Sequence, residues 1–91
     1  MVAISLYTTR TDTFLECLAK IKGNKEALLE LGKKIKRLSK DPLHTGGWLT
    51  GALHGKKSTR VAKRYRLIFL PDEKEQVVYL IAIDHREHVY E

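Results

Sequence analysis

The sequence predicts an α+β domain with the element order β-α-α-β-β-β, in which a helix hairpin packs on one face of a mainly antiparallel four-stranded sheet. Apolar residues alternate over short runs at the start of the chain and in its last third, and between them they recur at helical spacing over two segments. The last three strand-like runs are joined by linkers short enough for antiparallel hairpins. A chain of 91 residues is expected to form one domain, residues 1–91, around one modest core.

The first strand is expected over residues 2–7, where Val2, Ile4 and Leu6 alternate with Ala, Ser and Tyr. The following stretch TTRTDTF supplies threonines and an aspartate as N-cap candidates for a helix. One face of that helix is apolar and carries Phe14, Cys17, Leu18 and Ile21. Gly23 and Asn24 are expected to end it.

A second helix is expected over residues 25–39, where Leu28, Leu31, Ile35 and Leu38 recur at intervals of three and four. It must end before the pair Asp41 and Pro42, because the residue before a proline avoids the helical region. Gly32 lies inside this helix, where glycine costs about 1 kcal/mol relative to alanine. We therefore expect another backbone to approach closely there.

A glycine-rich loop over residues 43–55 leads into three strands, expected over residues 56–62, 65–70 and 77–84. Alternation places Tyr65, Leu67 and Phe69 on one face of the sheet and Arg66 on the other. Lys56, Ser58 and Arg60 likewise share a face. If the helices cover Tyr65, Leu67 and Phe69, the remaining face is expected to be a basic concavity.

The charge is unevenly distributed. Residues 31–71 hold eleven of the seventeen lysines and arginines but one acid, Asp41, which gives this segment a net charge of +10 in a chain of net charge +6. Such asymmetry is typical of a surface that meets phosphates, although helix lysines also serve solubility alone. The residues expected to contact such a polyanionic partner are Lys33, Lys34, Lys36, Arg37, Lys57, Arg60, Lys63 and Arg64.

Several classes of site and location are disfavoured. No stretch approaches the ~20 apolar residues needed to span a bilayer, and the first residues lack a basic leader, so a cytoplasmic protein with no membrane partner is expected. The single cysteine, Cys17, can form no internal disulfide and has no second cysteine at zinc-binding spacing. We expect neither a metal nor a cofactor.

The stretch LHGKKSTRVAKRYRLIF, followed by an apolar strand and HREHVY, resembles the RelE family of toxins from type II toxin–antitoxin systems. The resemblance covers nearly the whole chain. It implies the fold described above, cleavage of messenger RNA in the ribosomal A site without a metal, inhibition of translation, and a cognate antitoxin that is acidic and amphipathic. The ribosome and mRNA are then the other partners, and the basic residues named above are expected to contact RNA.

The resemblance also implies site residues. The Tyr-Arg pair of the family matches Tyr65 and Arg66, and Arg66 aligns with an arginine that grips the scissile phosphate. Lys56 and Arg60 match the basic residues of the preceding strand, and Ser58 stands where better-studied members have a second lysine. The candidate catalytic residues are Arg66, Arg86, Tyr90, Lys56 and His85.

These residue types suit RNA cleavage by attack of the 2′-hydroxyl on phosphorus, which needs a base, cations for the phosphorane and a proton donor. Arginine suits the phosphate because its planar fork donates to two oxygens. Lys56, His85, His88 and Tyr90 remain alternatives for proton transfer. Two other functions also remain open: a ParE-like toxin that inhibits gyrase, and a non-catalytic module that binds RNA or the ribosome.

Overall fold

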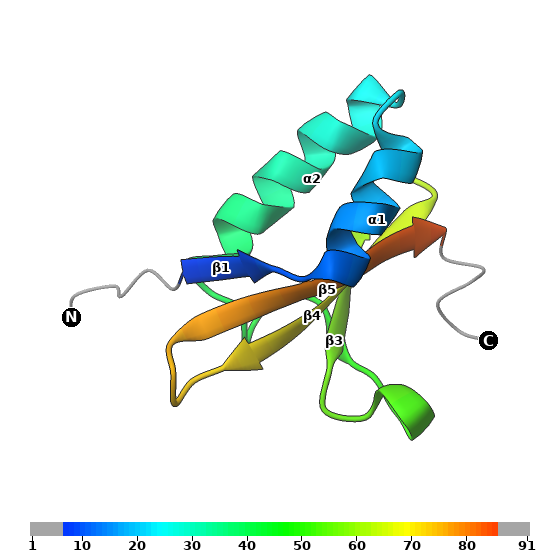
Figure 1. Cartoon of the computed structure of the whole chain (residues 1–91). Helices are drawn as coiled ribbons and strands as arrows, with labels where there is room; N and C mark the ends of the chain where they lie inside the picture. Colours follow the sequence, from blue (N-terminus) through cyan, green and yellow to red (C-terminus); the bar gives the residue numbers. More distant parts are fainter. Residues whose placement is uncertain (1–6, 86–91) are drawn as a thin grey trace.

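The computed structural model describes residues 7–85, which form two layers: a twisted sheet and a pair of helices on one of its faces (Figure 1). Within these residues the sheet has five strands in the order β1-β5-β4-β3-β2. The elements are β1 (Tyr7–Arg10), α1 (Asp12–Ile21), α2 (Lys25–Leu38), β2 (Gly47–Trp48), the 3-10 turn η1 (Gly51–Leu53), β3 (Lys57–Val61), β4 (Tyr65–Asp72) and β5 (Val77–His85). The predicted α+β class and the helix hairpin are confirmed.

The strand pairing is antiparallel except that β1 runs parallel to β5. The strand expected over residues 2–7 lies, apart from Tyr7, outside the described residues. The chain is still extended over Thr8, Thr9 and Arg10, which were expected to lead into the helix, because these residues pair with β5. The short β2 lies inside the segment expected to be a loop and adds a strand beside β3.

Thr11 both begins α1 and ties it to the sheet. Its Oγ1 accepts a hydrogen bond from the Phe14 N–H (3.2 Å), which satisfies one of the free donors at the helix start. The same hydroxyl donates to the carbonyl oxygen of Leu80 on β5 (2.9 Å), and the Thr11 N–H donates to that oxygen as well (3.2 Å). This residue therefore fixes the start of α1 against the central part of β5.

The second helix begins at an asparagine cap, where Asn24 Oδ1 accepts from the Ala27 N–H (3.1 Å). Gly32 is exposed on α2, and a Cβ added there would meet nothing within 4 Å. The predicted close approach of another backbone is therefore wrong, because this side of α2 faces outward. Neither α1 nor α2, the α-helices of the described chain, is long and apolar enough to cross a membrane.

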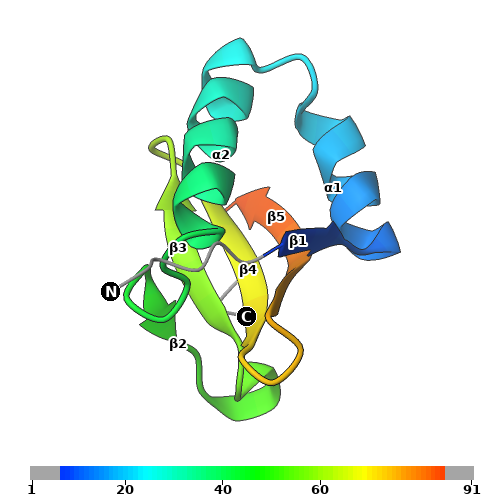
Figure 2. The same ribbon diagram turned by 90° about the vertical axis from the view of Figure 1, so that its left-hand side faces the viewer.

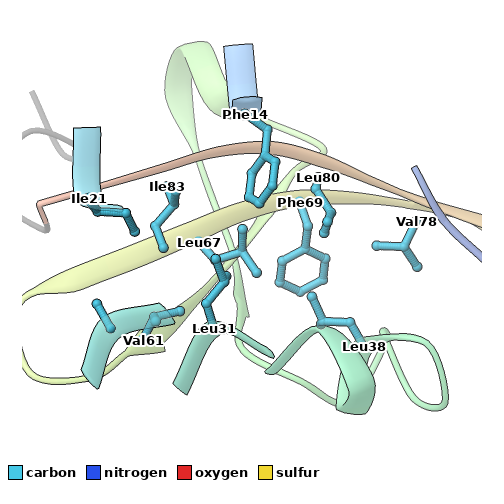
Figure 3. Packing of buried hydrophobic residues seen from close by; sticks show 11 residues of the cluster. Phe14, Ile21, Leu31, Leu38, Val61, Leu67, Phe69, Val78, Leu80 and Ile83 are labelled. Atoms are coloured by element: carbon cyan, nitrogen blue, oxygen red, sulfur yellow. The ribbon is translucent and has the colours of Figure 1, made fainter. Parts of the chain in front are cut away.

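The core lies between the two layers. Phe14 from α1, Leu38 from α2, and Leu67 and Phe69 from β4 are all fully buried and point toward one another (Figure 3). Tyr65 is partly buried and packs against the same cluster. The predicted face of Tyr65, Leu67 and Phe69 is therefore the one that the helices cover.

The other face of the sheet has a smaller apolar cluster near its middle. Leu49 and Ile68 are buried there, with Leu53, Ile81 and Ala82 packed against them. Figure 2 shows α1 and α2 on the same side of the sheet, so this cluster is covered by the segment between β2 and β3, which includes η1, and not by an α-helix. We call the side of the sheet that carries this cluster the open face.

Candidate functional site

Three charged residues lie side by side across the open face. Arg60 on β3 is opposite Arg66 on β4, and Arg66 is opposite Asp84 on β5. Directly opposed residues on paired strands project to the same face. We call Arg60, Arg66 and Asp84 the charged row.

The neighbouring row fixes the face on which these side chains lie. Ser58, Ile68 and Ala82 are paired two residues away on the same three strands, and Ile68 belongs to the cluster of the open face. Because side chains alternate along a strand, the charged row shares that face. Arg60 is exposed, whereas Arg66 is half-buried with its Nε inside the protein.

Asp84 was not anticipated from the sequence. Its Oδ1 accepts a hydrogen bond from the His85 N–H (2.7 Å), which holds the carboxylate at the end of β5. A β-bulge between Ile68 and Phe69 shifts the register of β4 against β5 by one residue. If the register at the β4–β5 turn continued without the bulge, Ile83 would lie opposite Arg66. The alternation of apolar and polar residues alone therefore does not predict that Asp84 lies beside Arg66.

His85 lies on the opposite side of the sheet from Arg66. It is paired with Tyr65, and the two ring centroids are 4.9 Å apart with their planes tilted by 48°. Because Tyr65 packs against the core between the layers, His85 is on the helix side of β5. The structure therefore does not bring together His85 and Arg66, two of the expected site residues.

Lys56 immediately precedes β3 and is half-buried. Since Lys57 points toward the helix layer, alternation directs Lys56 to the open face. It is four residues from Arg60, or ~13 Å along an extended chain. Ser58 lies between them and is only 3% exposed. Lys56 therefore stands at the opposite end of β3 from the charged row.

Lys57 is expected from the sequence to contact RNA, but the structure buries it, with 1% of the residue exposed. Its Nζ donates to the carbonyl oxygens of Pro42 (3.3 Å) and Leu43, and lies 4.9 Å from the ring centroid of Trp48. Burial lowers the pKa of Lys57, and the carboxylate of Asp41 acts in the other direction. The buried ammonium is not presented to a partner, so we exclude Lys57 from the RNA-contacting set.

The remaining basic residues lie on other surfaces. The cations of α2 and its end belong to the helix layer, and Lys33 forms an ion pair with Glu30 (3.3 Å). Lys63 and Arg64 are exposed in the β3–β4 turn and line a shallow pocket of about 280 Å³ beside Asn24 and Glu26. The α2 cations that the sequence singled out are exposed or half-buried: Lys33, Lys34, Lys36 and Arg37.

Two of the expected catalytic residues, Arg86 and Tyr90, lie outside the described residues, as does His88. Arg86 follows His85, the last residue of β5, directly in the sequence. Of the five expected catalytic residues, the structure therefore places Arg66 and Lys56 on the open face and His85 on the helix side.

No family model and no curated protein matches the chain. Solved structures do match. A chain of the toxin–antitoxin complex RelBE2 from Mycobacterium tuberculosis is 26% identical with a TM-score of 0.75, and the match covers 93% of this chain and 95% of that one. YafQ from E. coli is 11% identical with a TM-score of 0.78, covering 92% and 97%. YoeB from Staphylococcus aureus, solved as a dimer, is 17% identical with a TM-score of 0.72, covering 90% and 98%.

Proposed function

We propose, from the premise that the chain has the fold of the RelE/ParE toxin superfamily, that it is the toxin of a type II toxin–antitoxin system. In this proposal it is a metal-independent endoribonuclease that cuts messenger RNA in the ribosomal A site and so inhibits translation. A cognate antitoxin that is acidic and amphipathic holds it inactive in the cytoplasm. The similarity to a chain of the RelBE2 toxin–antitoxin complex supports such a partner.

The observation that carries the catalytic proposal is the pair of arginines in the charged row. Arg60 and Arg66 are directly opposed on β3 and β4, on the face that the helices leave open. Two arginines at opposed positions suit a phosphodiester, because a guanidinium group can donate two parallel hydrogen bonds to its oxygens. A phosphate bound there would lie against a rigid sheet, which positions reacting groups better than a loop does.

In the proposed reaction, the 2′-oxygen attacks the adjacent phosphorus and the 5′-oxygen leaves. Arg66 and Arg86 hold the phosphate and stabilise the negative charge that develops on the phosphorane. Lys56 supplies a further cation at the other end of β3. Tyr90 and His88 are the candidates for protonating the leaving oxygen. The position of His85 on the helix side does not favour a role in this proton transfer.

The cations outside the open face are proposed to bind the ribosome. Those of α2 and those of the β3–β4 turn would contact ribosomal RNA phosphates, and contacts of this kind release counterions. Binding should therefore weaken steeply as the salt concentration rises. Charge-removing changes at Lys36 and Arg37 should reduce that salt dependence, because both are exposed on α2.

The proposal is tested by comparing cleavage of the same messenger RNA when it is free and when it is bound to programmed ribosomes. Cleavage should be fast on the ribosome and slow on free RNA, because a small basic surface cannot alone align the 2′-oxygen with the leaving group. Equal rates on the two substrates would remove the ribosome from the mechanism. The readout is primer extension across the A-site codon.

A gyrase-inhibiting toxin is the second candidate, and Asp84 is the observation that favours it. A carboxylate opposite Arg66 could make that arginine part of a structural pair with no phosphate to bind. Trapped gyrase–DNA complexes without any RNA cleavage would support this function. Ribosome binding without cleavage would instead indicate a non-catalytic module.

A further inference from the structure

We infer that Asp84 is the general base that takes the proton from the attacking 2′-hydroxyl. The inference rests on the proposed function and names a group for a role that the sequence leaves open between Lys56, His85, His88 and Tyr90. It follows from the charged row, in which Asp84 is the direct neighbour of Arg66.

Distance is the first reason. Opposed residues of antiparallel strands have Cα atoms about 4.5–5.5 Å apart, with side chains on the same face. If Arg66 holds the scissile phosphate, the 2′-oxygen lies beside that phosphate on the adjoining ribose. A carboxylate next to Arg66 is therefore within reach of the hydroxyl proton, as a general base must be.

Orientation is the second reason. The Asp84 carboxylate is fixed by the hydrogen bond from the His85 N–H to Oδ1 (2.7 Å). The backbone of Asp84 is part of the ladder between β4 and β5, which continues to His85, whereas β1 pairs with β5 only as far as Leu80. A base that is held in place contributes more than a mobile one, because less freedom is lost in the transition state.

The other described candidates are less well placed. His85 faces the helix layer beside Tyr65. Lys56 stands ~13 Å along β3 from Arg60, at the far end from the charged row. Among residues 7–85, Asp84 is therefore the proton acceptor that the strand register sets beside Arg66.

The charges around Asp84 allow one surface both to bind a phosphate and to hold a general base. Arg66 from β4 faces it directly, Arg60 from β3 lies one strand further away, and His85 is on the reverse side of β5. The row thus carries two positive charges and one negative charge, so it can still attract a phosphate.

The step conserves atoms and charge. The 2′-O–H proton passes to the Asp84 carboxylate as the 2′-oxygen forms a bond to phosphorus. The bond between phosphorus and the 5′-oxygen breaks, and the 5′-oxygen leaves with the electron pair and takes a proton from Tyr90 or His88. Asp84 then returns its proton to water, and the products are a 2′,3′-cyclic phosphate and a 5′-hydroxyl.

The decisive variant is Asp84→Asn, with Asp72→Asn as the matched control. Asp72 also lies on a strand of this sheet and accepts a backbone N–H, from Glu75 (3.1 Å), but it is at the other end of β4. On programmed ribosomes, Asp84→Asn should lower kcat at least ~10²-fold with little change in KM. Asp72→Asn should leave both unchanged.

The pH profile separates a base from a structural partner of Arg66. The wild-type rate should not rise between about pH 6 and 9, because a carboxylate is already deprotonated there, although a histidine as the proton donor would make the rate fall. The residual rate of Asp84→Asn should rise about tenfold per pH unit, since hydroxide must then remove the proton. Asp84→Glu should be faster than Asp84→Asn and keep the pH profile of the wild type. Thermal unfolding of each variant checks the fold, and Asp84→Ser replaces Asp84→Asn if the latter does not fold.

Three results would overturn the inference while leaving the proposed function intact. They are an Asp84→Asn variant with the kcat of the wild type, a loss of cleavage in that variant with an unchanged pH profile, and a wild-type rate that itself rises with pH. The second of these would make Asp84 a structural partner of Arg66. Failure of the wild-type protein to cut ribosome-bound message would instead overturn the proposed function.

Discussion

Tyr65 and His85 face each other at the ends of β4 and β5, with their ring centroids 4.9 Å apart and their planes tilted by 48°. The contact lies on the side of the sheet that the helices cover, because Tyr65 packs against the core cluster. It joins the last residue of β5 to the core. Aromatic pairs of this geometry contribute about 0.5–1.5 kcal/mol beyond the area that they bury.

His85→Phe should therefore leave cleavage on programmed ribosomes close to wild type, since phenylalanine keeps the ring contact and His85 does not face Arg66. His85→Ala should lower the free energy of unfolding by about 1 kcal/mol. Urea denaturation and the cleavage assay measure the two effects. If His85→Phe folds normally but loses cleavage, the imidazole takes part in proton transfer after all. His44→Phe, at an exposed position in the loop after α2, is the control.

Two glycines should respond in opposite ways to the same substitution. Gly32→Ala should raise the free energy of unfolding by about 0.5–1 kcal/mol, because the position is exposed in a helix and has space for a Cβ. Gly46→Ala should lower it by at least ~2 kcal/mol, because Gly46 has φ +70° and an added Cβ would lie 2.1 Å from the Ser58 carbonyl oxygen.

Gly47→Ala is the matched control for Gly46→Ala, since a Cβ at Gly47 meets nothing within 4 Å. Urea denaturation followed by the fluorescence of Trp48, the single tryptophan, gives each free energy. A destabilised Gly32→Ala would mean that the outer side of α2 makes a contact that the isolated chain lacks. Equal effects at positions 46 and 47 would show that the loop before β2 adapts.

The layers of this fold could be predicted from the sequence because periodicity reports directly on burial. Phe14 and Leu31 mark the inward faces of the helices, and Leu67 and Phe69 mark the covered face of the sheet. The ends of elements were less predictable. The threonines before Thr11 are good helix caps, but their pairing with β5 keeps them extended.

The candidate site could be predicted only in part, because the missing information is the register between distant strands. Arg60 and Arg66 belong to a short hairpin, so alternation places both on the open face. The shift in register between β4 and β5 at Ile68 and Phe69 is not encoded in any alternation pattern, and it moves Asp84 to the open face and His85 to the helix side. The burial of Lys57 also could not be predicted from the sequence, because it depends on the carbonyl groups of residues fifteen and fourteen positions away.

The buried Lys57 predicts a specific dependence of stability on pH. Burial lowers its pKa, so in the range between that lowered pKa and the ordinary value of 10.5 the unfolded chain binds more protons than the folded one. The contribution of Lys57 to the free energy of unfolding should therefore rise as the pH rises through this range, and the cost of burying the charge is largest below it. Lys57→Met should remove this rise.

The measurement compares urea denaturation of the wild type and Lys57→Met at several pH values, so that titrations common to both proteins cancel. Lys56→Met is the control, because it changes the same residue type one position away. A difference between wild type and Lys57→Met that stays constant up to about pH 10.5 would show that the ammonium keeps its ordinary pKa through its bonds to the Pro42 and Leu43 carbonyls.

Arg66→Ala should abolish cleavage of ribosome-bound message while the domain still folds, because Arg66 is half-buried on the open face and outside the core between the layers. The loss should be at least ~10²-fold in kcat, or about 3 kcal/mol, as is usual when a donor to a developing negative charge is removed. Arg66→Lys should restore little, since a single ammonium cannot reproduce the planar fork. Arg10→Ala is the control, as Arg10 lies on the helix side with its guanidinium 5.9 Å from the centre of the Phe14 ring. If both Arg66 variants cut at the wild-type rate, the phosphate is bound elsewhere, and Arg60, the exposed member of the charged row, becomes the next residue to replace.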